Sequence, residues 1–304
     1  MLPRPATSFT FDIDIKSRTR TGIQAFLATS LVHFYPPKHH KQASAIINQV
    51  LARSPSNIPS LMGQAFVQQA ALKWKDAGAT FDLVSSIIPD DVNLGLRARE
   101  EGAWCKVQIN LCEEGLVDLQ LVLDTLNGLD DDDKRNSDRA RCLWRMGECY
   151  MLLTGPSMSC SPVLLYSLSF ISDVESSYKC FIKALKQDST FAPAFTSLGI
   201  YYNDILSPPD PIRASKCFQK AFELDAREAV AARQLVQGFA NDAEWDLVEV
   251  VAQRTIDGEG GVTGGLDKSE FDPTSRYLPT NSWAWKAIGV VKFVSRFRTT
   301  FSAG

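Results

Sequence analysis

The sequence has no long apolar run and no strong excess of one charge. Its longest apolar run, Val163 to Ile171, is nine residues long and contains two serines, which is about half of what a membrane-spanning helix needs. Charged side chains interrupt the first twenty residues, so we expect no secretory signal. With 32 basic and 35 acidic residues, the net charge is −3. We therefore expect neither a membrane protein nor strong direct binding of nucleic acid.

Motifs for catalysis, nucleotide binding and metal binding are also missing. There is no phosphate-binding loop and no G-x-S-x-G motif, and the glycine-rich run GEGGVTGG follows no strand-like segment. His33, His39 and His40 have no cysteine or acidic residue near them at the spacing of metal ligands. The acidic run from Asp130 to Asp133 lacks the alternating ligands and the glycine of a calcium loop. We expect no enzyme, no cofactor and no metal site.

The seven cysteines include no C-x-x-C pair and mostly lie within apolar, helix-like stretches. Cys105 and Cys112 are seven residues apart, as are Cys142 and Cys149, which places each pair on one helix face. Free cysteines in such positions behave as small apolar side chains. They indicate a reducing compartment. We expect a cytoplasmic protein, and a nuclear location is also compatible with the sequence.

What the sequence does contain is a repeat with a period of 34 residues. A small residue, a large apolar one, a second small or apolar one and a proline occur twice at this spacing, as Ala43, Ile47, Val50 and Pro55 and as Ala77, Phe81, Val84 and Pro89. This order is the second-helix signature of the tetratricopeptide repeat (TPR).

The first-helix half of the TPR pattern, an apolar residue followed by Leu or Met, Gly and Tyr, appears further along the chain. It occurs as Leu143, Met146, Gly147 and Tyr150 and as Phe195, Leu198, Gly199 and Tyr202. The matching second helices carry Ser177, Phe181 and Ala184 in one repeat and Ala214, Phe218 and Ala221 in the other. Weaker units pass through Ala103 to Val122 and Ala232 to Thr255, and a last first helix begins near Trp285.

Each helical hairpin of such a repeat has apolar stripes that it cannot cover alone, so consecutive hairpins stack. Small residues let the helices approach, and large residues fill the grooves beside them. We therefore predict an all-α TPR solenoid, a right-handed superhelix of antiparallel helical hairpins. In it, Gly147 packs against Phe181 and Gly199 against Phe218. The alternative is an unrelated helical bundle.

The predicted TPR array extends from residue 22 to residue 256, after a flexible tail of residues 1–21. Gly147 and Gly199 are 52 residues apart rather than 34, so the array contains an insertion, at residues 155–173. This serine-rich, apolar segment is either a functional loop or the translation of a retained intron.

Two further segments follow the predicted array. Residues 257–279 form a glycine-rich linker that cannot continue a helix. Residues 280–304 contain the start of a further TPR helix, which breaks off after Lys292 into an aberrant tail. Without a partner helix, we expect it to be mobile or docked near Trp245 to Thr255.

TPR arrays present the fifth and ninth residues of their first helices to bound peptides. No asparagine occupies these positions, so a clamp for chaperone tails is unsupported. Several large side chains are candidates for a partner-binding strip, and they are Phe66, Trp104, Trp144, Glu148 and Ile200. The competing interpretation is that these side chains only contact the next hairpin.

Several stretches resemble a particular TPR family, namely HFYPPKHHKQASAIINQVL, SLMGQAF, AREEGAWCKV, SYKCFIKALKQDSTFAPAFTSLGIYY, ASKCFQKAFELD and RYLPTNSWAWKAIGVV. The family is the TPR scaffold subunit of the superkiller (Ski) complex in its fungal form, and the resemblance covers residues 36–154 and 174–291. The YLPTNSWAW segment is the most specific part of it.

The resemblance implies a non-enzymatic scaffold. In that family, a longer TPR array holds an RNA helicase and WD-repeat subunits together, and the assembly assists the cytoplasmic exosome in 3′ to 5′ mRNA decay. This sequence departs from the family pattern after GVV, so contacts made by later repeats do not transfer to it. The alternative is a generic TPR adaptor that binds a partner peptide, for example one from a chaperone.

Overall fold

The computed structural model describes residues 7–34, 37–129, 133–154, 169–260 and 282–301, and these residues form helices joined by short turns. The helices are α1 (Thr7–His33), α2 (His40–Arg53), α3 (Ile58–Ala70), α4 (Trp74–Ile87), α5 (Leu94–Gln108), α6 (Cys112–Gly128), α7 (Asp133–Thr154), α8 (Ser169–Gln187), α9 (Ala192–Ile200) with a π-helical turn η1 (Tyr201–Ile205), α10 (Pro211–Leu224), α11 (Ala229–Asn241), α12 (Trp245–Gly260) and α13 (Ser282–Phe301). No strand occurs within these ranges.

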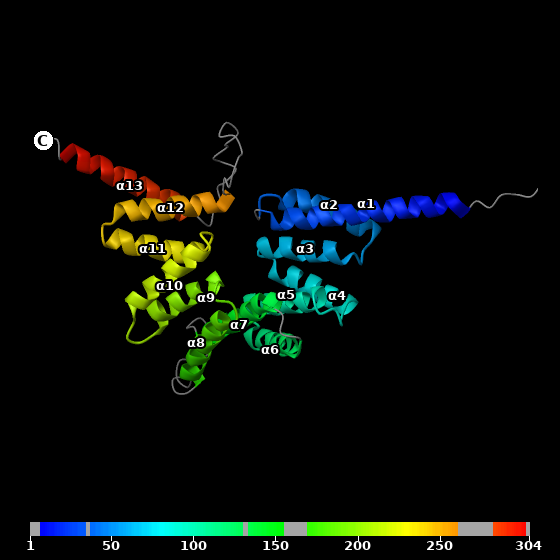
Figure 1. Ribbon diagram of the computed structural model, residues 1–304, viewed down its shortest axis with the longest axis horizontal. Coiled ribbons are helices and arrows are strands. Elements are labelled where there is room, and N and C mark those ends of the chain that lie inside the picture. Colours follow the sequence, from blue (N-terminus) through cyan, green and yellow to red (C-terminus); the bar gives the residue numbers. More distant parts are fainter. Residues whose placement is uncertain (1–6, 35–36, 130–132, 155–168, 261–281, 302–304) are drawn as a thin grey trace, which may run out of the picture. The chain divides into compact units, whose positions relative to one another are not determined.

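The chain divides into two compact units, residues 1–124 and residues 125–304. In the first unit, α1 packs against α2 and α3, and α4 packs against α3 and α5 (Figure 1). In the second unit, α7 packs against α8, α9 against α10, α11 against α12 and α12 against α13. Successive first helices also contact each other, as α7 does α9, α9 does α11 and α11 does α13. These are the contacts of stacked TPR hairpins, so the prediction of an all-α TPR solenoid is confirmed.

Local sequence signals explain where several helices begin. The Asn57 side chain accepts a hydrogen bond from Ser60 N (3.1 Å) at the start of α3, and Asp210 accepts one from Arg213 N (2.9 Å) at the start of α10. A proline occupies the first turn of both helices. Inside hairpins, the tight turns place a residue with positive φ two positions before the second helix; these residues are Leu72, Asn110 and Ala243.

Two glycines of the repeat pattern lie directly under aromatic rings of the paired helix. A Cβ atom added to Gly147 would lie 2.7 Å from Cδ1 of Phe181, and one added to Gly199 would lie 2.6 Å from Cδ1 of Phe218. Both distances are far shorter than a normal carbon–carbon contact. The hairpins α7–α8 and α9–α10 therefore close only because these positions carry no side chain.

Most of the other residues singled out by the repeat pattern are buried, namely Ala77, Phe81, Ala184, Ala214 and Ala221. Tyr150 and Tyr202 are half-buried. Pro89 is the exception, because its side chain is exposed and follows the end of α4. Its place in the pattern reflects a helix stop, so it does not serve as a packing residue.

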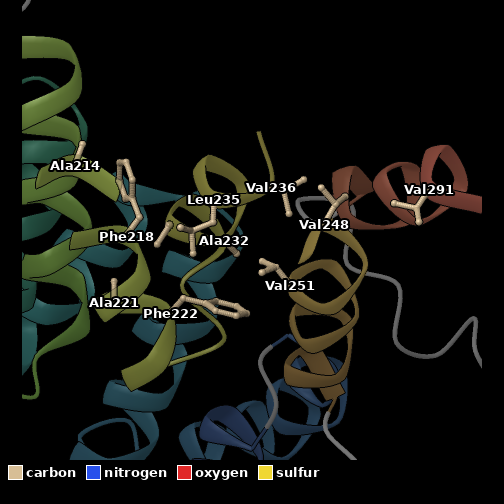
Figure 2. Packing of buried hydrophobic residues seen from close by; sticks show 11 residues of the cluster. Ala214, Phe218, Ala221, Phe222, Ala232, Leu235, Val236, Val248, Val251 and Val291 are labelled. Atoms are coloured by element: carbon tan, nitrogen blue, oxygen red, sulfur yellow. The ribbon is translucent and has the colours of Figure 1, made fainter. Parts of the chain in front are cut away.

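The C-terminal half of the second unit has one continuous apolar core (Figure 2). Phe218 of α10 and Leu235 of α11 belong to it, as do Val236 of α11, Val248 of α12 and Val291 of α13. A second cluster joins α12 to α13. The last helix is therefore docked on α12 and α11, which is the second of the two outcomes expected for it.

Four boundaries differ from the sequence-based expectations. The insertion was placed at residues 155–173, but α8 begins within it at Ser169. The flexible tail was placed at residues 1–21, but α1 begins at Thr7, because residues 7–21 contain neither glycine nor proline to stop a helix. Helix α12 extends to Gly260, into the expected linker. Helix α13 continues past Lys292 to Phe301, since its last turns also lack a helix breaker. Residues 155–168 of the insertion, 261–279 of the linker and the two residues after the linker lie outside the described part of the chain.

Candidate protein-interaction surface

The five candidate partner-binding residues all lie on first helices of the hairpins. Phe66 is on α3 and Trp104 on α5, in the first unit; Trp144 and Glu148 are on α7 and Ile200 is at the end of α9, in the second unit. All five are half-buried. The contacts that hold these side chains differ between the two units.

In the second unit, a serine links Trp144 and Glu148 to the next repeat. Trp144 Nε1 donates a hydrogen bond to Ser197 Oγ (2.8 Å), and Ser197 Oγ donates one to Glu148 Oε1 (2.5 Å). The Trp144 ring also meets Phe191 edge-on, with 5.8 Å between ring centroids. Both side chains therefore hold α7 to α9, as the competing interpretation of the sequence proposed, and this limits what they can offer to a partner.

A second polar link of this kind joins α9 to α11. Thr196 Oγ1 donates a hydrogen bond to Glu228 Oε2 (2.9 Å), and Glu228 directly precedes the first residue of α11. Burial raises the pKa of the Glu228 carboxyl. Neither Ser197 nor Glu228 was among the residues predicted from the sequence. The signal for Ser197 was a pair of hydroxyl side chains next to the Leu-Gly of a first helix, where buried apolar residues are the rule.

Ile200 has a different environment. Its side chain packs against the apolar core formed by α10, α11 and α12. It therefore contributes to the contact between consecutive hairpins of the second unit, alongside the two polar links.

The link through Glu148 predicts a pH-dependent stability. Burial raises the pKa of Glu148 above its ordinary value of 4.5, and the hydrogen bond from Ser197 opposes this only in part. The stability that Glu148 contributes is therefore fully present below pH 4.5 and is lost as the pH rises through its folded-state pKa. A Glu148→Gln variant keeps the acceptor but cannot ionise. We expect it to lose less stability than the wild type between acidic and neutral pH, as measured by urea unfolding at a series of pH values.

A matched control is Glu223→Gln, which changes a half-exposed carboxylate of α10. That variant shows what the loss of one surface carboxylate does by itself, so a flatter curve for Glu148→Gln can be assigned to the buried position. Burial raises the pKa of Glu228 as well. The stability of Glu148→Gln should therefore still fall as the pH rises, but less steeply than that of the wild type. If the free energies of unfolding of Glu148→Gln and the wild type changed in parallel with pH, ionisation of the Glu148 carboxyl would cost no stability.

In the first unit, Phe66 lines a small pocket between α1, α2, α3 and α4. Its ring meets His33 and Phe81 edge-on, at centroid distances of 5.0 and 5.4 Å. The pocket has a volume of about 300 Å³ and also contacts His40 and Trp74. His40 is hydrogen-bonded through Nε2 to the carbonyl of Val32 (3.1 Å). Burial lowers the pKa of His33, and the nearby Arg97 guanidinium lowers it further, so the pocket disfavours added positive charge.

Polar side chains also join the first helices of the first unit. Gln69 of α3 donates a hydrogen bond to Glu101 of α5 (3.0 Å), and Arg97 forms an ion pair with Glu101 (2.6 Å). The Glu101 residue is only 1% exposed. Trp104 is one helical turn further along the same face of α5. In this unit too, a polar link joins consecutive first helices, beside one of the residues predicted to meet partners.

Other side chains that could bind a metal ion or form a disulfide make up no metal-binding group and no disulfide within the described residues. His39 Nδ1 lies 3.3 Å from Gln42 Oε1, and no group of three or more His, Cys, Asp or Glu side chains in these ranges is arranged to hold a metal ion. Five of the six described cysteines are buried, and none of the six forms a disulfide. Within the same ranges, no helix combines the length and the apolar character needed to cross a lipid bilayer.

Stacked helical hairpins, glycines under aromatic rings and first helices joined along one face define a TPR protein. Solved structures agree with this fold. Human IFIT1 aligns with 78% of this chain and 50% of its own, with a TM-score of 0.54 and 15% identity, and the type IV pilus biogenesis factor PilW aligns with 77% of this chain and 92% of its own, with a TM-score of 0.50 and 17% identity. At such identities the likeness concerns the fold alone. No family model matches the sequence.

Curated relatives narrow the class further. The chain is 32% identical over 248 residues to superkiller protein 3 of Schizosaccharomyces pombe, and 28% identical over 273 residues to superkiller protein 3 of Saccharomyces cerevisiae. These alignments cover 81% and 90% of this chain. They span 16% and 17% of the relatives, so the chain corresponds to about a sixth of their length. The chain is a superkiller protein 3-like TPR protein.

Proposed function

We propose that the chain acts as a non-enzymatic scaffold segment of a superkiller-type complex. In this role it holds an RNA helicase subunit and a WD-repeat subunit and assists the cytoplasmic exosome in 3′ to 5′ mRNA decay. The observation that carries the proposal is the 32% identity to superkiller protein 3 over 81% of the chain. The helicase, WD-repeat and exosome roles come from the family resemblance.

The arrangement of the described residues supports a scaffold. Buried polar links, such as Gln69 with Glu101 and Ser197 with Glu148, connect successive first helices inside each unit. Such links are satisfied only when neighbouring repeats keep their spacing, because a buried carboxylate without a donor costs free energy. Rigid spacing between repeats is what a protein that positions several partners requires.

Co-purification tests the proposal. The 304-residue chain, tagged and expressed in cells of its source, should recover a DExH helicase and a WD-repeat protein. A tagged TPR protein of similar length but unrelated sequence serves as the control and should recover neither. Recovery of a chaperone in place of these two proteins would contradict the scaffold function and favour a generic TPR adaptor.

A further inference from the structure

The second unit contains an apolar pocket that no candidate residue of the sequence analysis reaches. It lies between α11, α12 and α13 and has a volume of about 260 Å³. Val236 and Val248 are buried side chains that line it, and Trp245 and Trp283 line it as half-buried side chains. Figure 2 shows Val236 and Val248 facing the same space beside α13. The volume is below the range usual for drug-sized ligands, so the pocket suits one or two side chains.

The position of the pocket follows from the TPR pattern. Arg233 and Gln237 occupy the fifth and ninth positions of α11, and Lys286 and Val290 occupy the same positions of α13, each 53 residues further along the chain. All four line the pocket. The pocket is therefore lined by matching positions of two successive first helices. Lys286 and Val290 were not among the candidates predicted from the sequence, although they lie in the part of α13 that was expected to begin a further TPR helix.

Two cations stand at the rim of this apolar pocket. Arg233 and Lys286 are exposed, and neither has an ion-pair partner in the part of the chain that the structure describes. An apolar floor between two cations is complementary to an apolar side chain with carboxylates next to it. The same features do not fit single-stranded nucleic acid well, because nucleic acid needs a charged groove that follows its backbone, and the buried valines offer no hydrogen bonds to base edges.

We propose that this pocket binds an acidic peptide segment of a protein partner. One apolar side chain of the segment enters between Trp245 and Trp283, and carboxylates on either side of it pair with Arg233 and Lys286. The inference deepens the proposed scaffold function, since it names the chemistry of one partner segment. The apolar anchor supplies most of the affinity, because exposed ion pairs contribute little. The cations select acidic partners and speed the encounter.

A synthetic peptide tests the proposal. The probe is a labelled peptide of about ten residues with one phenylalanine between two pairs of glutamates, and its binding to the 304-residue chain is followed by fluorescence anisotropy. We expect micromolar affinity that weakens with salt. Replacing the phenylalanine by alanine, or the glutamates by glutamines, should each weaken binding about tenfold or more.

Charge reversal locates the site on the protein. The double variant Arg233→Glu and Lys286→Glu should bind the probe at least about tenfold more weakly. The matched control reverses Lys216 and Lys292, two exposed lysines outside the pocket on α10 and α13, so that net charge changes equally. It should bind like the wild type. A third variant, Ala240→Phe, fills the pocket without removing a cation and should abolish the preference for the phenylalanine peptide. Circular dichroism checks that each variant stays folded.

Several outcomes would overturn the proposal. Equal weakening by both double variants would show only a general charge effect, and equal binding of the alanine peptide would show that no apolar anchor is used. Binding of an oligouridylate with the same dependence on Arg233 and Lys286 would assign the site to nucleic acid. Self-association lost in the Ala240→Phe variant would assign the pocket to a second copy of the chain. Co-purification of the helicase with the Arg233 and Lys286 variant separates a failure of this pocket from a failure of the scaffold function.

Discussion

Replacing Gly199 by leucine is expected to destabilise the second unit by about 1 to 3 kcal/mol, which is the usual cost of overpacking. Gly199 lies on α9 beneath the ring of Phe218, and even a single Cβ atom there would lie 2.6 Å from Cδ1 of that ring. Phe218 cannot easily move away, because it is 4% exposed and belongs to the apolar core shared by α10, α11, α12 and α13. Urea unfolding followed by circular dichroism would measure the change in free energy.

The matched control inserts the same side chain at Gly238 of α11. A Cβ atom at Gly238 meets nothing within 4 Å, and leucine is a better helix former than glycine by somewhat under 1 kcal/mol. Gly238→Leu should therefore be neutral or stabilising. A second variant combines Gly199→Leu with Phe218→Ala. It should lose less stability than the sum of its two single changes, because removal of the ring makes room for the leucine side chain. A neutral Gly199→Leu would show that α9 and α10 do not close at this position.

The fold was predictable because the TPR pattern places the small and large residues that pack together at fixed positions along the chain. The alternation of small and large residues identified Gly147 and Gly199 as the places where helices approach, and the structure puts Phe181 and Phe218 directly over them. Such pairs can be inferred from sequence because each depends on only two positions of one hairpin. The boundary of α1 was missed for the opposite reason. None of the recognised repeat positions lies before Ala43, so no pattern marked residues 7–21 as helical, although they contain neither glycine nor proline to stop a helix.

The interaction surface was harder to predict because it depends on neighbouring repeats. Trp144 and Glu148 were identified by their positions on α7, but their hydrogen bonds to Ser197 depend on how α9 is placed beside α7. The pocket at Arg233 requires α13 to dock on α11 and α12. The spacing of the repeat is lost between α12 and α13, since the glycine-rich segment separates them. No pattern confined to one repeat carries that information.

Replacing Phe181 by alanine should have the largest effect of the changes considered, a loss of about 3 to 5 kcal/mol. The Phe181 side chain is fully buried between α8 and α7, and its ring occupies the space that Gly147 leaves open. The cavity left by the ring has no side chain at Gly147 to fill it, so the surrounding helices can relax only partly. A loss of this size is a large fraction of the stability of a typical domain. Urea unfolding monitored by tryptophan fluorescence should report it, since Trp144 is on the paired helix α7.

Two comparisons sharpen this expectation. Ile212→Ala removes a side chain of α10 that is 70% exposed and should change stability by less than about 0.5 kcal/mol. Phe81→Ala makes the equivalent change in the first unit, where Phe81 is fully buried at the same repeat position, and it should expose amides of α3 and α4 to hydrogen exchange. With Phe181→Ala, the newly exchanging amides should be those of α7 and α8. If Phe181→Ala cost no more than Ile212→Ala, α7 and α8 would have to be held together by contacts other than the ring over Gly147, and the packing rule by which the repeats were recognised would not operate in this hairpin.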